Sequence, residues 1–236
     1  MKTQNKLQNL AIILLLAMMV TVTVPVIILG ANFNFPDILR EPAAVAFALF
    51  RENQTIIVFG YYIFLLSSLL FIPLSIALQK VLYQSKNKTA LNLFVGFGLA
   101  TAIFQCIGFV RWIFVMPFLT ESYFSNRENQ KTITIIYEML NRYAGMSIGE
   151  HLGFLVMGCW TICLGLMLLK HPKFKTWVGF SGIPIGFCLM ISTAEHFGGI
   201  MASTLADINM IANTLWNFWL ITIAFFIFRM KGKISV

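Results

Sequence analysis

The sequence predicts an all-α integral membrane protein, a bundle of about six transmembrane helices with short interfacial helices in its outer loops. Of its 236 residues, 58% are hydrophobic and only 11% are charged, and the mean hydropathy is +0.81. Soluble globular domains carry about 25% charged residues, so that class is excluded. The apolar residues are gathered into long runs, each close to the ~20 residues that a helix needs to cross a bilayer.

Six apolar runs follow one another without a Ser/Gly-rich linker or a low-complexity segment between them. A single polytopic domain covering residues 1–236 is therefore expected. The third and fifth runs are longer than a bilayer requires, which predicts tilt, or a kink at Pro117 or Pro184. The expected spans are about 10–30, 55–78, 91–119, 148–169, 177–205 and 208–228.

Two outer loops are long enough to form structure of their own. In the first loop, the sequence Phe-Pro-Asp-Ile-Leu-Arg-Glu-Pro at 35–42 precedes an apolar stretch at 43–50. This order predicts a turn followed by a short interfacial helix. In the second loop, at 128–143, apolar residues recur at helical spacing and predict an amphipathic helix. Its apolar face would hold Ile133, Ile136, Leu140 and Tyr143.

The distribution of charge predicts the orientation in the membrane. With both termini in the cytoplasm, eleven of the seventeen basic residues and none of the nine acidic residues fall on the cytoplasmic side, as the positive-inside rule requires. Topology and attraction to lipid headgroups explain the net charge of +8, so the bilayer is the expected partner and no nucleic acid is needed. The cytoplasmic basic residues would be Lys2, Lys6, Lys80, Lys86, Lys88, Lys170, Lys173, Lys175, Arg229, Lys231 and Lys233.

Two of the three histidines lie in the same pattern, Glu-His-Leu/Phe-Gly, at 150–153 and 195–198, and both copies lie in apolar segments. Ionisable side chains in a span are costly and usually face a cavity, a partner or a ligand. Successive spans alternate in direction, and at ~1.5 Å rise per residue several polar residues would reach one layer in the outer half of the bilayer. This layer would hold Arg111, Glu150, His151, Glu195, His196, Asn209 and Asn213.

The polar layer allows a structural interpretation and several ligand-binding ones. Arg111 could pair with Glu150 or Glu195 while the histidines hydrogen-bond across the bundle. The two glutamates, with His151 and His196, are also competent ligands for zinc or iron. Adjacent helical residues point ~100° apart, so we expect one member of each Glu-His pair to bind a metal and the other to orient it. The histidines could instead be the axial ligands of a haem.

Three classes of function follow from this layer. The first is a non-catalytic protein that binds or senses a small-molecule or lipid ligand. The second is a metal-dependent intramembrane enzyme acting on a lipid or a small outer-face substrate, with Glu150 or Glu195 as the general base. The third is a haem- or quinone-binding electron-transfer protein. The sequence lacks a P-loop and a nucleophile elbow, and it does not indicate an oligomeric state.

Three stretches of the chain are similar to a known family. They are the loop at 35–42, Gly-Phe-Val-Arg-Trp at 108–112 with Pro117, and Tyr-Ala-Gly at 143–145 leading into Gly-Glu-His-Leu-Gly at 149–153 with Trp160. They resemble the bacterial membrane-protein family called domain of unknown function 4386. The resemblance covers most of the chain and implies a polytopic protein of the bacterial cytoplasmic membrane. It directs attention to Arg111 and Glu150 and implies no activity, because the family has none assigned.

Overall fold

The computed structural model describes residues 2–82 and 88–231, and every regular element among them is a helix. Six helical stretches of this part of the chain are long and apolar enough to cross a membrane. The predicted all-α membrane fold is therefore confirmed. The six stretches are Gln4–Phe33, Ala43–Leu82, Thr89–Ser125, Arg127–Leu169, Thr176–Phe197 and Ala202–Met230.

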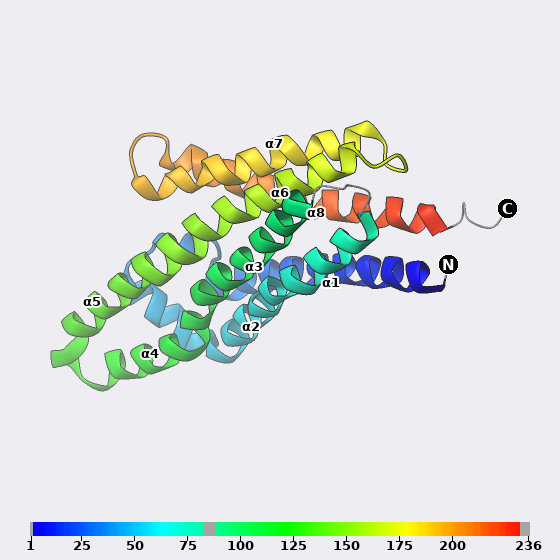
Figure 1. The fold of residues 1–236 in the computed structure, drawn as a ribbon. Coiled ribbons are helices and arrows are strands. Elements are labelled where there is room, and N and C mark those ends of the chain that lie inside the picture. The colour runs from blue at the N-terminus through cyan, green and yellow to red at the C-terminus, as the bar shows by residue number, and fades with distance from the viewer. Residues whose placement is uncertain (1, 83–87, 232–236) are drawn as a thin grey trace. The chain divides into compact units, whose positions relative to one another are not determined.

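Several of these stretches join α-helices through a π-helical or 3-10 segment. The α-helices are labelled in Figure 1. The α-helices are α1 (Lys2–Phe33), α2 (Ala43–Leu82), α3 (Lys88–Val110), α4 (Met116–Ser125), α5 (Gln130–Leu140), α6 (Gly153–Leu169), α7 (Thr176–Ser192) and α8 (Ala202–Lys231). The π-helices are η2 (Arg111–Val115) and η4 (Asn141–Leu152), and the 3-10 helices are η1 (Asp37–Arg40), η3 (Arg127–Asn129) and η5 (Thr193–Phe197).

The chain divides into two compact units, and each is described by itself. Unit 1 comprises Met1–Met19, Leu69–Ile103 and His151–Val236, and unit 2 comprises Val20–Ser68 and Phe104–Glu150. Long helices such as α2 contribute residues to both units. The residues predicted for the polar layer are divided between the two units.

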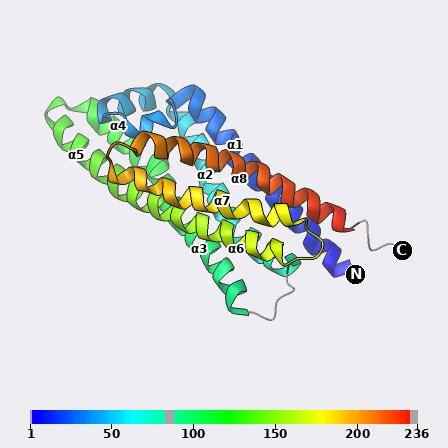
Figure 2. The ribbon, with the colours of Figure 1, turned by 90° about the horizontal axis from the view of Figure 1, so that it is seen from above.

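Unit 1 contains a tightly packed antiparallel pair, α6 and α7, which lie side by side in both Figure 1 and Figure 2. Glycine allows the close approach, because a Cβ at Gly158 would meet the carbonyl of Gly186, and a Cβ at Gly165 would meet the carbonyl of Gly179. Small residues at helix contacts are typical of membrane bundles. The short connection at 170–175 then brings the start of α6 and the end of α7 to the same end of the pair.

Buried tryptophans add hydrogen bonds to the apolar packing of unit 1. Trp160 donates from Nε1 to Oγ of Ser75 at 2.8 Å, and Trp216 donates to Oγ1 of Thr161 at 3.0 Å. Both indoles are buried, and a buried indole N–H usually requires such a partner. These bonds fix how α2, α6 and α8 pack within the unit.

Unit 2 is built around an aromatic core that includes Phe33, Tyr61 and Trp112, all of them buried. The rings of Tyr61 and Trp112 are stacked with centroids 4.9 Å apart, and Phe33 meets Trp112 edge to face at 5.1 Å. Aromatic pairs in these arrangements stabilise a core beyond their area of contact, by about 0.5–1.5 kcal/mol. The core thereby fixes the first turn of η2, in which Arg111 precedes Trp112.

The fifth span ends at Phe197, so the prediction that it continues to residue 205 was wrong. Gly198 and Gly199 have φ values of 77° and 94°, in the region that glycine adopts at little cost. They end the helix, and residues 202–205 belong to the start of α8. Hydropathy averaged over a long window does not mark this break, because apolar residues such as Phe197 and Ile200 flank the two glycines directly.

The stretch at 43–50 is helical as predicted, but it is continuous with the second span rather than a separate helix. A kink at Asn53, whose φ of −124° and ψ of 25° are not helical, marks the boundary between the stretch at 43–50 and the second span. The Asn53 side chain donates to the carbonyl of Asn32 at 3.1 Å. The predicted start of the second span at residue 55 lies just after this kink.

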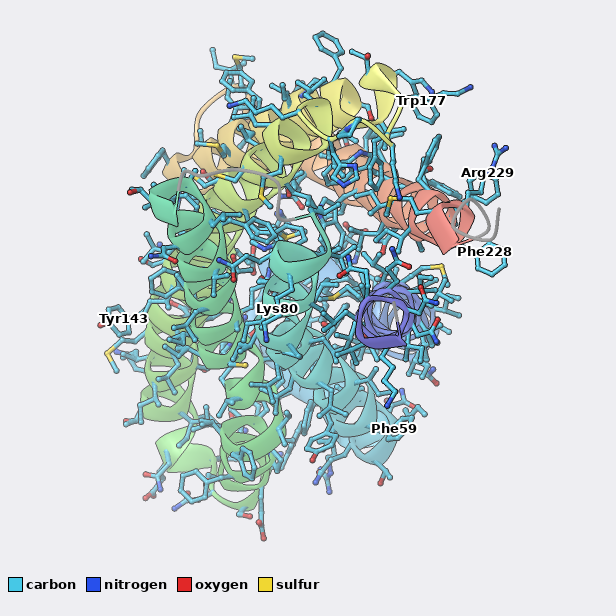
Figure 3. All side chains as sticks on the ribbon, turned by 45° about the vertical axis from the view of Figure 1, so that its right-hand side comes forward. Phe59, Lys80, Tyr143, Trp177, Phe228 and Arg229 are labelled. Carbon is cyan, nitrogen blue, oxygen red and sulfur yellow. The ribbon has the colours of Figure 1, made fainter. Side chains whose placement is uncertain are left out.

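The predicted amphipathic helix in the second outer loop is observed as α5, but Tyr143 does not share its buried face. Ile133 and Tyr137 are buried, whereas Tyr143 is 66% exposed and projects away from the ribbon in Figure 3. The helix changes from α to π at Asn141. The longer turn of a π-helix shifts the following residues around the axis, so a spacing rule for α-helices fails beyond that residue.

The two prolines expected to kink spans behave differently. Pro117 is the second residue of α4, two positions after the π-helical segment η2 ends, and because proline has no N–H, it cannot donate to a carbonyl in the preceding turn. Pro184 lies inside α7, which runs on through it to Ser192. Of the basic residues that predict the orientation, Lys86 and Lys233 lie outside the described residues.

Candidate functional site

In unit 2 the Arg111 guanidinium donates hydrogen bonds to Asn141 and Gly108, and Arg111 is only 8% exposed. Nη2 donates to Oδ1 of Asn141 at 2.9 Å, and Nη1 donates to the carbonyl of Gly108 at 3.0 Å. The same Asn141 amide donates from Nδ2 to the carbonyl of Leu39 at 3.1 Å. Asn141 therefore connects the buried cation to η1, the turn that follows α1.

Glycines of η4 make the space that Arg111 occupies. A Cβ at Gly145 would overlap the guanidinium of Arg111, and a Cβ at Gly149 would meet the α-carbon of Gly108. The backbone of η4 therefore approaches that of α3 directly beside Arg111. Asn141, Gly145 and Gly149 recur at intervals of four residues, so one side of η4 is shaped to receive the arginine.

Glu150 is the acidic residue of unit 2 that acts most strongly on Arg111. The two charges attract each other, and Arg40 adds a weaker attraction on the same carboxylate. A buried charge is stable only when it is paired or hydrogen-bonded. The combination of Glu150, Asn141 and the Gly108 carbonyl meets this requirement for Arg111, which favours a structural role for the residue.

The cavity beside Arg111 has a volume of about 10 Å³, and its polar lining consists of Arg111, Tyr137 and Asn141. This is about the space of one water molecule, whereas sites for organic ligands measure about 300–1,000 Å³. The Tyr137 hydroxyl is buried and has no hydrogen-bond partner among the described residues. This part of unit 2 is therefore packed too closely for an organic ligand.

In unit 1, His151, Glu195 and His196 come together at one end of the α6–α7 pair. His151 lies just before α6, and the other two lie on η5 just after α7. The imidazole rings of His151 and His196 have centroids 6.4 Å apart. Oε1 of Glu195 is 3.8 Å from Nδ1 of His196, and these two side chains are 8% and 10% exposed. We refer to these three residues as the His–Glu cluster.

A backbone hydrogen bond fixes the orientation of His151. Its Nδ1 lies 3.2 Å from the carbonyl oxygen of Thr193. A carbonyl can only accept, so Nδ1 carries the proton and the lone pair of the neutral ring is on Nε2. The two residues are 42 positions apart in the chain, and only the antiparallel packing of α6 on α7 brings them together.

The expectation that adjacent Glu and His residues point away from each other does not apply to Glu195 and His196. Neighbouring residues of the 3-10 helix η5 point about 120° apart, so it is the side chains, and not the backbone, that turn towards each other. Their side-chain atoms are 3.8 Å apart, close enough for both members of the pair to face one ligand. The two copies of the Glu-His pattern thus differ in backbone geometry, because Glu150-His151 lies in the π-helix η4 and Glu195-His196 lies in the 3-10 helix η5.

Asn209 and Asn213 support the turn that carries the His–Glu cluster. Asn209 donates from Nδ2 to Oγ of Ser192 at 2.9 Å, and Asn213 donates to Oδ1 of Asn209 at 2.9 Å. Ser192 is buried and is the last residue of α7 before η5 begins. The two asparagines, predicted as ligand or ion-pair residues, therefore hold α8 against the base of η5.

The predicted polar residues belong to both units, Arg111 and Glu150 to unit 2 and the His–Glu cluster, Asn209 and Asn213 to unit 1. Asn141, Gly145 and Tyr137 were not predicted as site residues, because they lie in a segment that the sequence analysis assigned to an outer loop. Their four-residue spacing with Gly149 was the available signal. This spacing places the four residues on one side of a helix, but only if the helix continues through the segment, as it does in the structure.

The fold defines this chain as a multi-pass helical membrane protein with buried polar side chains in its spans. The chain belongs to the family described as "Domain of unknown function (DUF4386)", whose profile matches residues 10–224. The predicted resemblance is therefore confirmed. No curated protein and no solved structure was found to match the chain.

Proposed function

We propose that this protein is a non-catalytic metal-binding protein of the membrane, and that the His–Glu cluster supplies its metal ligands. The hydrogen bond from Nδ1 of His151 to the carbonyl of Thr193 carries this proposal. Histidines that bind metals commonly donate their second ring N–H to a carbonyl or a carboxylate, which fixes the tautomer and orients the ring. His151 has this arrangement.

The spacing of Glu195 and His196 suits a single ion. Zinc binds histidine nitrogen and carboxylate oxygen at about 2.0–2.2 Å, so two donors on the same ion lie up to about 4 Å apart. The Glu195–His196 separation of 3.8 Å falls within this limit. Two imidazoles and one carboxylate form a donor set used for zinc and for non-haem iron. Zinc or iron(II) is therefore the proposed ligand.

Both carboxylates that the enzyme hypothesis needs as a base have other roles here. Glu195 would be a metal ligand, and Glu150 interacts with Arg111. A general base must instead be placed to take a proton from the substrate or from water. This arrangement favours metal binding or sensing over metal-dependent catalysis.

The proposed location is the bacterial cytoplasmic membrane, with both termini in the cytoplasm. The connection at 170–175 contains three lysines, which the positive-inside rule assigns to the cytoplasmic side. The His–Glu cluster lies at the opposite end of the α6–α7 pair. It would therefore lie in the outer half of the membrane, where it can take up a metal from outside the cell.

Titration of the full chain in mild detergent with Co²⁺ tests the proposal, since cobalt replaces zinc and absorbs visible light when bound by nitrogen and oxygen donors. We expect saturation at one ion per chain, with loss of the absorption in His151→Ala and in His196→Ala. His171→Gln is the matched control, because His171 lies in the connection at the other end of the same helix pair. Equal absorption in all four proteins, or none in the wild type, would refute the proposal.

A further inference from the structure

We propose that unit 2 binds one water molecule in the cavity beside Arg111, and that this water joins Arg111, Tyr137 and Asn141 by hydrogen bonds. The site lies wholly within unit 2, so it is independent of the metal ligands proposed in unit 1. Three properties of the cavity support it: its volume, the polar side chains that line it, and a buried hydroxyl group on one of its walls.

The cavity has room for a single small molecule. Its volume of about 10 Å³ is close to the least space that holds a water molecule and far below that of a site for an organic ligand. A chloride ion is larger than water, and the attraction of Glu150 already opposes the charge of Arg111. Size and charge therefore both favour water. The apolar walls are Val115, Met116, Leu119 and Leu140.

Three polar residues line the cavity, each from a different helical element: Arg111 of η2, Tyr137 of α5 and Asn141 of η4. A buried water typically makes about three hydrogen bonds. A guanidinium carries five N–H groups, and the bonds to Asn141 and Gly108 use two of those on Arg111. The Asn141 amide has two N–H groups and two lone pairs, and its bonds to Arg111 and Leu39 use one of each. Both side chains therefore have groups that can bond to a water.

The hydroxyl of Tyr137 gives the strongest indication of a bound water. Tyr137 is only 4% exposed, and its hydroxyl has no hydrogen-bond partner among the described residues. A buried hydroxyl without a partner is destabilising, and buried waters typically bond to such unsatisfied groups. Because Tyr137 lines the cavity, a water there can accept from its O–H and also bond to Arg111 or Asn141. The water would thereby connect α5 to η2 and η4.

Tyr61 provides a matched comparison within the same unit. It is 1% exposed, and its hydroxyl also has no hydrogen-bond partner in the described part of the chain. Both tyrosines belong to the aromatic core of unit 2, but the residues that line the cavity include only Tyr137. Removing each hydroxyl in turn therefore separates the effect of a bound water from the effect of burial.

The first test detects the water in the wild-type chain, purified in mild detergent, by X-ray radiolysis. X-rays split water into hydroxyl radicals, and a radical formed from a bound water oxidises the side chains that it touches. Methionine is readily converted to its sulfoxide. Met116 lines the cavity and is 2% exposed, whereas Met157 lies in unit 1 and is 3% exposed. Mass spectrometry should find Met116 oxidised several-fold faster than Met157.

The second test compares the melting temperatures of Tyr137→Phe and Tyr61→Phe with that of the wild type. Without a bound water, either substitution removes an unsatisfied hydroxyl and should leave the melting temperature unchanged or raise it. With a bound water, Tyr137→Phe removes one of its hydrogen bonds and should lower the melting temperature, whereas Tyr61→Phe should not. A repeat of the wild-type measurement with gluconate in place of chloride shows whether an anion occupies the cavity.

Faster oxidation of Met116, together with a lower melting temperature in Tyr137→Phe alone, supports the inference. Oxidation of Met116 as slow as that of Met157 refutes it, because the cavity would then be dry. A melting temperature of Tyr137→Phe equal to or above that of the wild type also refutes it. Equal losses in both tyrosine variants, or a wild-type melting temperature that falls without chloride, refute it as well, since packing or an anion would then explain the effect.

Discussion

The guanidinium of Arg111 lies against the α-carbon of Gly145, in the space where any side chain at position 145 would begin. Asn141, four residues earlier on η4, accepts a hydrogen bond from the same guanidinium. One helical segment therefore both makes room for the cation and holds it. A buried arginine in a span needs such an arrangement, since a charge without partners in an apolar medium is strongly destabilising.

Gly145→Ala is predicted to lower the thermal stability of the protein in detergent. The added methyl group would displace the guanidinium and weaken its bonds to Asn141 and Gly108. Overpacking of this kind costs about 1–3 kcal/mol. Gly96→Ala provides the control, because a Cβ there meets nothing within 4 Å. If both variants melt at the wild-type temperature, Arg111 is not held as described.

Asn141→Asp is predicted to loosen η1 while keeping the contact with Arg111. A carboxylate still accepts from the guanidinium, but it has no N–H for the carbonyl of Leu39. Leaving a buried carbonyl without its partner costs about 1–3 kcal/mol, and the half-buried Leu39 carbonyl should lie at the lower end of this range. Hydrogen exchange at the amides of Asp37–Arg40 should become faster in this variant. Unchanged exchange there would show that the Asn141–Leu39 bond does not hold the turn.

Gly158→Ala is predicted to weaken metal binding although residue 158, seven positions after His151, is not itself a proposed ligand. A Cβ at this position would meet the carbonyl of Gly186 and push α6 away from α7. The distance between His151 and Thr193 depends on the packing of this pair. A Co²⁺ titration checks the effect, and Gly96→Ala again provides the control. Affinity equal to that of the wild type would show that the pair does not set the geometry.

Acid is predicted to destabilise the connection between α6 and α7 through His171. Burial lowers the pKa of this imidazole, and the neighbouring Lys173 lowers it further. As the pH falls below the ordinary value of about 6.5, the unfolded chain takes up the proton before the folded chain does. Stability is therefore lost between that pH and the lower pKa of the folded state.

His171→Gln should remove this part of the pH dependence. Glutamine offers an oxygen in place of Nδ1, which accepts from the backbone N–H of Lys173 at 3.3 Å. Melting temperatures of the two proteins, measured between about pH 5 and pH 7.5, should differ increasingly towards low pH, with the wild type falling faster. If the melting temperatures of the two proteins fell in parallel with pH, His171 would not be the source of the acid sensitivity.

The spans could be predicted from the sequence because hydropathy is a property of single residues added over a window. The end of the fifth span could not, because it depends on the backbone angles of Gly198 and Gly199. The prediction that Tyr143 lies on the apolar face was wrong for a related reason. The helix changes type at Asn141, and this change alters the spacing of residues that share a face. Local backbone geometry, rather than composition, decided both cases.

The candidate site could be predicted in part. The repeated Glu-His pattern identified His151, Glu195 and His196, because ionisable residues stand out in apolar sequence. The bond from His151 to Thr193 joins residues 42 positions apart, and it requires the packing of two helices that no local pattern describes. Asn141 was missed because an asparagine in a segment with charged neighbours resembles a solvated loop.

The metal content of protein purified in mild detergent without chelator tests the central claim most directly. Elemental analysis should find close to one zinc or iron per chain in the wild type and in His171→Gln, and neither metal in His196→Ala or in Glu150→Gln, His196→Ala. No metal in the wild type after growth with added zinc and iron, or equal metal in every variant, would contradict the claim. Iron accompanied by a Soret band would also contradict it, since the ligand would then be a haem.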